Sequence, residues 1–95
     1  MLEDTYAYVV DDITAEIFKE AYKANFMYPP FHSAHEGLAI IQEEFDELKQ
    51  EVYAKQGQRD WEAMHKEAVQ TAAMCVRLIA DVINPNRAGQ QTGND

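Results

Sequence analysis

Cysteine and basic residues are scarce in this sequence, and each scarcity argues against a class of protein. The one cysteine, Cys75, leaves no partner for an internal disulfide and no cysteine-based metal site. Eight Lys and Arg stand against 17 Asp and Glu, which gives a formal net charge of −9. This charge disfavours a nucleic-acid polymer as a partner, because such binding depends on basic residues that neutralise phosphates.

Segments that direct a chain to or through a membrane are also missing. No stretch approaches the roughly 18 consecutive apolar residues of a membrane-spanning helix. The first residues, Met-Leu-Glu-Asp, are not the basic and then apolar start of a signal peptide. We therefore expect a soluble, cytoplasmic protein with no membrane partner.

Apolar residues, in contrast, are plentiful for so short a chain. The 95 residues suffice for one domain, yet 46% of them are hydrophobic, including one Trp, five Tyr and four Phe. This is more apolar surface than three short helices bury by themselves. We therefore expect a homo-oligomer, a dimer or a tetramer, in which a second copy completes a helical bundle.

The first predicted helix begins at Asp12 or Thr14, either of which is a suitable N-cap, and runs to about Asn25. Apolar residues recur along it at helical spacing. Pro29 and Pro30 stop it, since proline cannot continue a helix. The preceding residues 1–11 show no clear pattern.

The second predicted helix starts after Ser33 and runs to about Ala54. Ser33 and Glu36 form a capping box, in which the serine oxygen accepts a free amide and the glutamate reaches back to the start of the helix. Steps of three and four separate the residues of its apolar stripe, which are Leu38, Ile41, Phe45, Leu48 and Val52.

A third helix is predicted from Trp61 to about Ile83, with Asp60 as its N-cap and a turn at Gly57 before it. The pair Asn84-Pro85 ends it. We therefore expect an all-α bundle of three main helices in a single domain at residues 1–85. Residues 86–95 are polar and form a predicted disordered tail.

Acidic residues gather on one face of the second helix, within an arc of about 100° beside the apolar stripe. A solvated acidic face is the plain interpretation. However, like charges three and four residues apart repel each other, and basic partners are mostly absent. A bound cation would remove this repulsion. The residues of this arc are Glu36, Glu43, Glu44, Glu47 and Glu51.

The third helix offers a complement in Glu67 and Gln70, at the edge of its apolar arc. If the two helices pack antiparallel through a short turn, Glu44 and Glu47 lie opposite Glu67. Hard cations such as Mg²⁺ take oxygen ligands, and a few carboxylates suffice when water and phosphate supply the rest. The two helices thus predict a magnesium site.

These segments resemble a known family. Glu43-Glu44-Phe45-Asp46-Glu47, followed after nineteen residues by Glu67-Ala68-Val69-Gln70, is similar to the two-part signature EExxE…ExxD. That signature is typical of the all-α, MazG-like nucleoside triphosphate pyrophosphohydrolases. The resemblance covers the second and third helices, about half of the chain.

The resemblance implies a bundle built from two or more chains and a need for Mg²⁺ or Mn²⁺. It also implies hydrolysis of a nucleoside triphosphate to the monophosphate and pyrophosphate. By position, Glu44, Glu47, Glu67 and Gln70 match metal ligands. Glu43, Glu44 and Glu47 match the catalytic glutamates, with Glu43 activating or orienting water.

Gln70 departs from the signature, which has Asp there. Its carbonyl oxygen still suits a hard cation, but it brings no charge and cannot act as a base. Asp46 and Asp81 are less favoured substitutes. The departure supports an alternative function, a regulatory or interaction protein of the same fold that has lost turnover.

A second alternative rests on Glu62 and His65, whose spacing is that of di-iron carboxylate bundles. His65 falls in the middle of the apolar arc, so a structural or interface histidine is the plainer interpretation.

Substrate contacts are predicted for four residues, Trp61, Phe31, His35 and Lys66. The aromatic rings would stack on a nucleobase, although core or interface packing is the plainer role. Lys66 shares a polar face with Arg77, where either residue would contact phosphate or simply face solvent.

Overall fold

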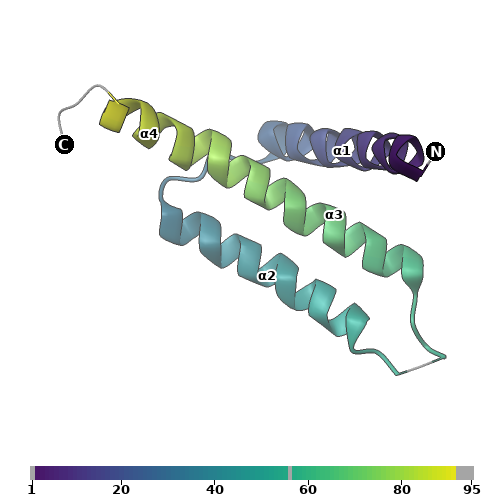
Figure 1. Cartoon of the computed structure of the whole chain (residues 1–95). Coiled ribbons are helices and arrows are strands. Elements are labelled where there is room, and N and C mark those ends of the chain that lie inside the picture. Colours follow the sequence, from purple (N-terminus) through teal and green to yellow (C-terminus); the bar gives the residue numbers. More distant parts are fainter. Residues whose placement is uncertain (1, 56, 92–95) are drawn as a thin grey trace.

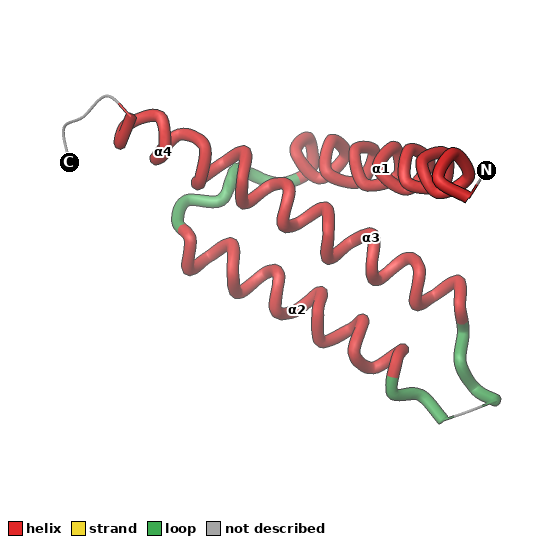
Figure 2. Tube along the Cα trace, in the orientation of Figure 1, coloured by secondary structure: helices red, strands yellow, loops and turns green. Residues whose placement is uncertain are grey.

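The computed structural model describes residues 2–55 and 57–91, which are helical apart from their connecting loops (Figure 2). Three long helices, α1 (Leu2–Met27), α2 (Ala34–Val52) and α3 (Trp61–Leu78), dominate this part of the chain, and it contains no strand. α3 lies between the other two, with α2 running antiparallel to it (Figure 1). The all-α prediction is confirmed. No helix among these residues is long and apolar enough to span a membrane.

α1 is longer than the sequence predicted. It begins at Leu2, so the predicted start at Asp12 or Thr14 is wrong. The hydroxyl of Thr14 does not cap a helix start. It donates to the backbone oxygens of Val10 and Asp11, a bond typical of threonine inside a helix. The predicted stop before the prolines agrees with the observed end at Met27.

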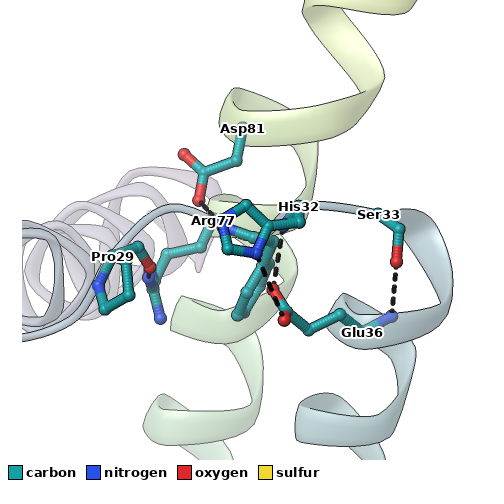
Figure 3. A network of polar contacts seen from close by, with 7 residues as sticks. Pro29, His32, Ser33, Glu36, Arg77 and Asp81 are labelled. Carbon is teal, nitrogen blue, oxygen red and sulfur yellow. Dashed lines mark hydrogen bonds and ion pairs between the residues drawn. The ribbon is translucent and has the colours of Figure 1, made fainter.

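The start of α2 is a capping box displaced by one residue. Ser33 Oγ accepts the amide of Glu36 at 3.1 Å, as predicted. Glu36 Oε1 accepts the amide of His32 at 2.8 Å, rather than that of the cap residue itself. These bonds join the connector, which we define as residues 28–33 between α1 and α2, to the first turn of α2 (Figure 3).

Arg77 of α3 binds the same connector (Figure 3). Its guanidinium donates to the carbonyl oxygen of Pro29 at 2.9 Å and lies 4.4 Å from the centroid of the Phe31 ring. Asp81 accepts the amide of Phe31 at 3.0 Å. Arg77 is only 6% exposed, so its predicted place on a solvent-facing side of the helix is wrong. The connector covers it.

The α2–α3 hairpin agrees with its predicted signals. Gly57 has a φ of 88°, a left-handed conformation that suits glycine at a turn. Asp60 Oδ1 accepts the amide of Ala63 at 3.1 Å and so caps α3. The short connection makes the two helices antiparallel neighbours.

The predicted end of the third helix at Asn84-Pro85 is wrong. α3 passes into a π-helical turn, η1 (Ile79–Ile83), and then into α4 (Asn84–Gln91). Pro85 directly follows the π-helical turn, in which the amide of Asn84 donates to the carbonyl oxygen of Ile79. The helix therefore continues past a proline that has no amide to donate, with the π-helical turn placed immediately before it. The predicted disordered tail, residues 86–95, is therefore helical as far as Gln91. Residues 92–95 lie outside the described part.

The core of the single chain is thin. Its buried apolar side chains are few, namely Ala24, Phe31, Val69, Ala73 and Met74. The radius of gyration is 16.2 Å, compared with about 13 Å for a compact chain of roughly 100 residues. Many large apolar side chains of α1 stay exposed, so the first helix packs by only part of its surface.

Gly37 of α2 is buried against Phe31 and Leu78. A Cβ atom there would lie 2.7 Å from Leu78 Cδ1 and 3.1 Å from Phe31 Cδ2. We expect Gly37→Val to lower the free energy of unfolding by about 2 kcal/mol or more, because overpacking forces neighbours to move. Urea denaturation measures this. Gly89→Ala, where an added Cβ meets nothing within 4 Å, is the control, and equal losses in both would contradict the prediction.

Candidate metal centre

The antiparallel packing of α2 and α3 brings three predicted ligands together. Glu44 and Glu47, one turn apart on α2, face Glu67 on α3, and one carboxylate oxygen from each lies within 4.8 Å of the other two. Within residues 2–55 and 57–91, no other group of three or more acidic, His or Cys residues has this geometry. The predicted meeting of these three side chains across the helix pair is confirmed.

The three carboxylates, which we call the glutamate triad, are only partly hydrated. Glu44 and Glu67 are half-buried and Glu47 is exposed. The Oε2 atom of Glu67 is shielded from solvent, yet it has no hydrogen-bond partner in the described part of the chain. Burying an unsatisfied carboxylate oxygen is costly. A cation beside it would provide the missing partner.

Burial and mutual repulsion both raise pKa values within the triad. Burial is the main cause that raises the pKa of Glu44, followed by the negative charges of Glu47 and Glu43. Burial also comes first in raising the pKa of Glu67, followed by the neighbouring carboxyl groups of Glu47 and Glu44. Both groups therefore resist ionisation when no cation is present.

Metal-free protein is expected to lose stability as the pH rises above 4.5, the ordinary pKa of these carboxyls. In that window the folded chain still holds protons that the unfolded chain has released. A rise in pH therefore lowers the free energy of unfolding until both groups have ionised. Urea denaturation at several pH values in a chelator measures the slope, and Glu44→Gln should flatten it. Identical slopes in the two proteins would refute the prediction.

The donor set suits a hard divalent cation. Opposite oxygens around Mg²⁺ lie about 4 Å apart, and around Ca²⁺ about 5 Å apart. The triad oxygens lie within 4.8 Å of one another, which allows all three to approach one cation. Three carboxylates leave the remaining coordination positions of the cation for water and for a ligand. A substrate phosphate is a suitable ligand for these positions.

A cavity of about 510 Å³ adjoins the triad and lies between the three long helices. This volume is within the usual range for small-molecule sites. Glu44 belongs to both the triad and the cavity lining, and Glu43 lines the cavity beside it. Apolar and basic side chains form much of the remaining wall, namely Ala24, Met27, Phe31, Ile40, Met74, Lys23 and Arg77.

Of the four predicted substrate contacts, only Phe31 lines this cavity. His35 is exposed at the start of α2. Trp61 is 67% exposed at the start of α3, with the guanidinium of Arg59 5.9 Å from its ring centroid. Lys66 lines a separate hollow with Glu16 and His65. The structure therefore places three of the four predicted contacts outside the cavity that adjoins the triad.

Gln70, the departure from the signature, also lines the cavity. Its Nε2 donates to Glu20 Oε2 of α1 at 2.8 Å, in a half-buried position. Sequence reasoning missed Glu20, although it stands three residues after Ile17 and four before Ala24 on the packed face of α1. Neither substitute acid joins the triad, since Asp46 is exposed and Asp81 binds the connector.

His65, the basis of the di-iron alternative, lies away from the triad. Its Nε2 is 2.8 Å from Glu16 Oε2 of α1, and this hydrogen bond, followed by the charge of Glu16, raises the pKa of His65. The side chain is exposed, so its predicted position inside the apolar arc is wrong. Glu62 and His65 belong to no metal-type cluster in the described part of the chain.

The class of protein that the fold and the triad define is an all-helical protein with three converging carboxylates beside a ligand-sized cavity. Comparison with protein-family models, curated proteins and solved structures found no match.

Proposed function

We propose that this protein is a magnesium-dependent nucleotide pyrophosphohydrolase, converting a nucleoside triphosphate or its deoxy form and water into the monophosphate and pyrophosphate. The observation that carries the proposal is the convergence of Glu44, Glu47 and Glu67 at the edge of the cavity. The resemblance of these residues to the MazG-like signature names the reaction. Mn²⁺ is expected to substitute for Mg²⁺ because it also takes carboxylate and water ligands.

In this proposal Glu44, Glu47 and Glu67 hold the cation, with Gln70 as a neutral oxygen donor. When bound, the cation supplies charge neutralisation for the polyphosphate and lowers the pKa of water. Glu43 lines the cavity next to Glu44, where it can orient the attacking water and accept its proton. No nucleophilic Ser or Cys is needed.

The cavity is the proposed site of the nucleoside. Its apolar wall, which includes Phe31 and Met74, suits a base and a sugar that must leave water. Lys23 and Arg77 on the same wall provide hydrogen-bond donors. Since Glu44 lines the cavity and also belongs to the triad, a nucleotide bound there would have its phosphates beside the cation.

We further propose that a second copy of the chain packs on the exposed face of α1. Phe18, Tyr22 and Phe26 stand one turn apart there, with ring centroids 5.7 and 5.0 Å apart in succession, and all three are more than half exposed. The thin core and the large radius of gyration support the same proposal. A dimer or a tetramer satisfies it, and the cytoplasm stays the predicted location.

The second candidate function is a regulatory or interaction protein that has kept the fold but lost turnover. The observation that favours it is the neutral side chain of Gln70 at the position where the signature has a fourth carboxylate, because an amide brings no negative charge and cannot act as a base. Such a protein would still bind the cation through the triad.

One assay distinguishes the two. Purified protein is incubated with each ribo- and deoxynucleoside triphosphate and Mg²⁺, and the products are separated by ion-exchange chromatography. We expect monophosphate and pyrophosphate in equal amounts from at least one nucleotide. Diphosphate with orthophosphate would indicate another reaction. No product, despite Mg²⁺ binding measured by calorimetry, would overturn the enzymatic proposal and favour the regulatory one.

A further inference from the structure

The hydrogen bond between Gln70 and Glu20 joins the metal-binding face of α3 to α1. Gln70 follows Glu67 by three residues, so the two side chains lie on the same face of α3, one turn apart. Its Nε2 lies 2.8 Å from Glu20 Oε2, and the contact is half-buried. Both side chains line the cavity that Glu44 also lines.

This bond determines which end of the Gln70 amide stays free. The NH₂ group of Gln70 donates to Glu20 Oε2, so the amide directs its nitrogen at α1. The atom left without this partner is the carbonyl oxygen, Oε1. A hard cation binds an amide through this oxygen and not through its nitrogen. With the amide reversed, Gln70 would present hydrogen-bond donors to a cation and repel it.

The packing of α1 supports a fixed position for Glu20. Ala24, one turn later, is buried in the core, and Ile17 and Ala21 pack against the same cluster. Glu20 therefore stands on the face that α1 presents to the other helices. Outer groups that orient metal ligands in this way commonly change metal affinity by roughly 10–100-fold when removed.

We propose that Glu20 is a positioning residue that turns the amide of Gln70 so that Oε1 becomes the fourth protein oxygen of the metal site. The inference rests on the proposed metal site of the glutamate triad. This orientation explains how an amide can bind the cation at the position where the signature has Asp. It also makes α1 part of the metal centre.

The test is a double-mutant cycle on Mn²⁺ affinity, measured by calorimetry on the full chain without nucleotide. Glu20→Met removes the acceptor, and Gln70→Leu removes the ligand oxygen. We expect each to weaken Mn²⁺ binding roughly tenfold. We expect the double variant to be no weaker than either single one, because Glu20 acts through Gln70. Glu16→Met, which removes a carboxylate one turn earlier on α1, is the matched control and should change the affinity less than about twofold.

A second measurement needs no variant. In a Mg²⁺ titration followed by NMR, the side-chain amide resonance of Gln70 should shift as Mg²⁺ is added. The dissociation constant fitted to this shift should equal the one that calorimetry gives for Mg²⁺ binding to the whole protein. Those of Gln42 and Gln50, both exposed on α2, should stay in place. An unmoved Gln70 resonance would overturn the inference even if a variant failed to fold.

The outcomes separate this inference from the proposed function. Unchanged Mn²⁺ affinity in Glu20→Met, or losses that multiply in the double variant, would refute the positioning role and leave the triad in place. If Glu44→Gln also binds Mn²⁺ as tightly as the unmodified chain, the proposed metal site itself is wrong.

Discussion

Glu44→Gln and Glu47→Gln are each expected to lower turnover by roughly 10³-fold or more and to weaken Mn²⁺ binding by at least about tenfold. Each substitution keeps the size of the side chain but removes one negative charge from a cluster of three. The helical circular-dichroism spectrum should stay unchanged, because both side chains sit at the edge of the helix pair. Steady-state kinetics with saturating Mg²⁺ and calorimetry with Mn²⁺ measure the two effects.

Asp46→Asn is the matched control for these two variants. It removes a carboxylate between Glu44 and Glu47 in the sequence, from an exposed position outside the triad, so turnover should change less than about twofold. Metal-free Glu44→Gln should also unfold at a higher temperature than the unmodified protein, because it removes the two causes that raise the pKa of Glu44, the burial of its charge and the repulsion from Glu47 and Glu43. Full activity in both glutamate variants would exclude the triad as the catalytic metal site.

Phe18→Glu combined with Phe26→Glu is expected to convert the oligomer to a monomer. Each buried phenylalanine contributes about 1.5–3 kcal/mol, and the new charges would have to be buried between two copies of a chain that already carries −9. The dissociation constant of the dimer should rise by roughly 10³-fold or more. Sedimentation velocity across a concentration series measures the change in mass.

Tyr53→Glu is the control for this experiment. Tyr53 is also aromatic and 75% exposed, but it follows the end of α2, away from the aromatic face of α1. Its substitution should leave the mass unchanged. If the unmodified protein sediments as a monomer at concentrations of tens of micromolar, the proposed role of α1 is wrong, and the exposed aromatic rings need another partner.

The glutamate triad was predictable because only local rules are needed to place it. The helical period puts Glu44 and Glu47 on one edge of α2. The cap at Asp60 and the turn at Gly57 then make α3 an antiparallel neighbour. Once both helices and the short turn are given, the facing position of Glu67 follows.

The sequence predictions were wrong where the pattern of apolar residues was weak, or where a segment distant in the sequence changed the environment of a residue. Nothing in residues 1–11 breaks a helix, yet their mixed composition did not predict one, and α1 begins ten residues before Asp12. Pro85 predicts a helix end, because the sequence does not reveal the π-helical turn that precedes it. The helical wheel of α3 predicts a solvent-facing Arg77, because a wheel does not include the connector residues that cover this side chain.

Sequence patterns alone predict the all-helical class, the caps of α2 and α3 and the facing positions of the three glutamates, because these depend on the helical period and on one short turn. Only the tertiary structure revealed the cavity, the burial of Arg77 and the bond between Gln70 and Glu20. The residues of that bond are 50 positions apart. Their contact depends on how α1 packs against α3, and no local periodicity encodes this packing.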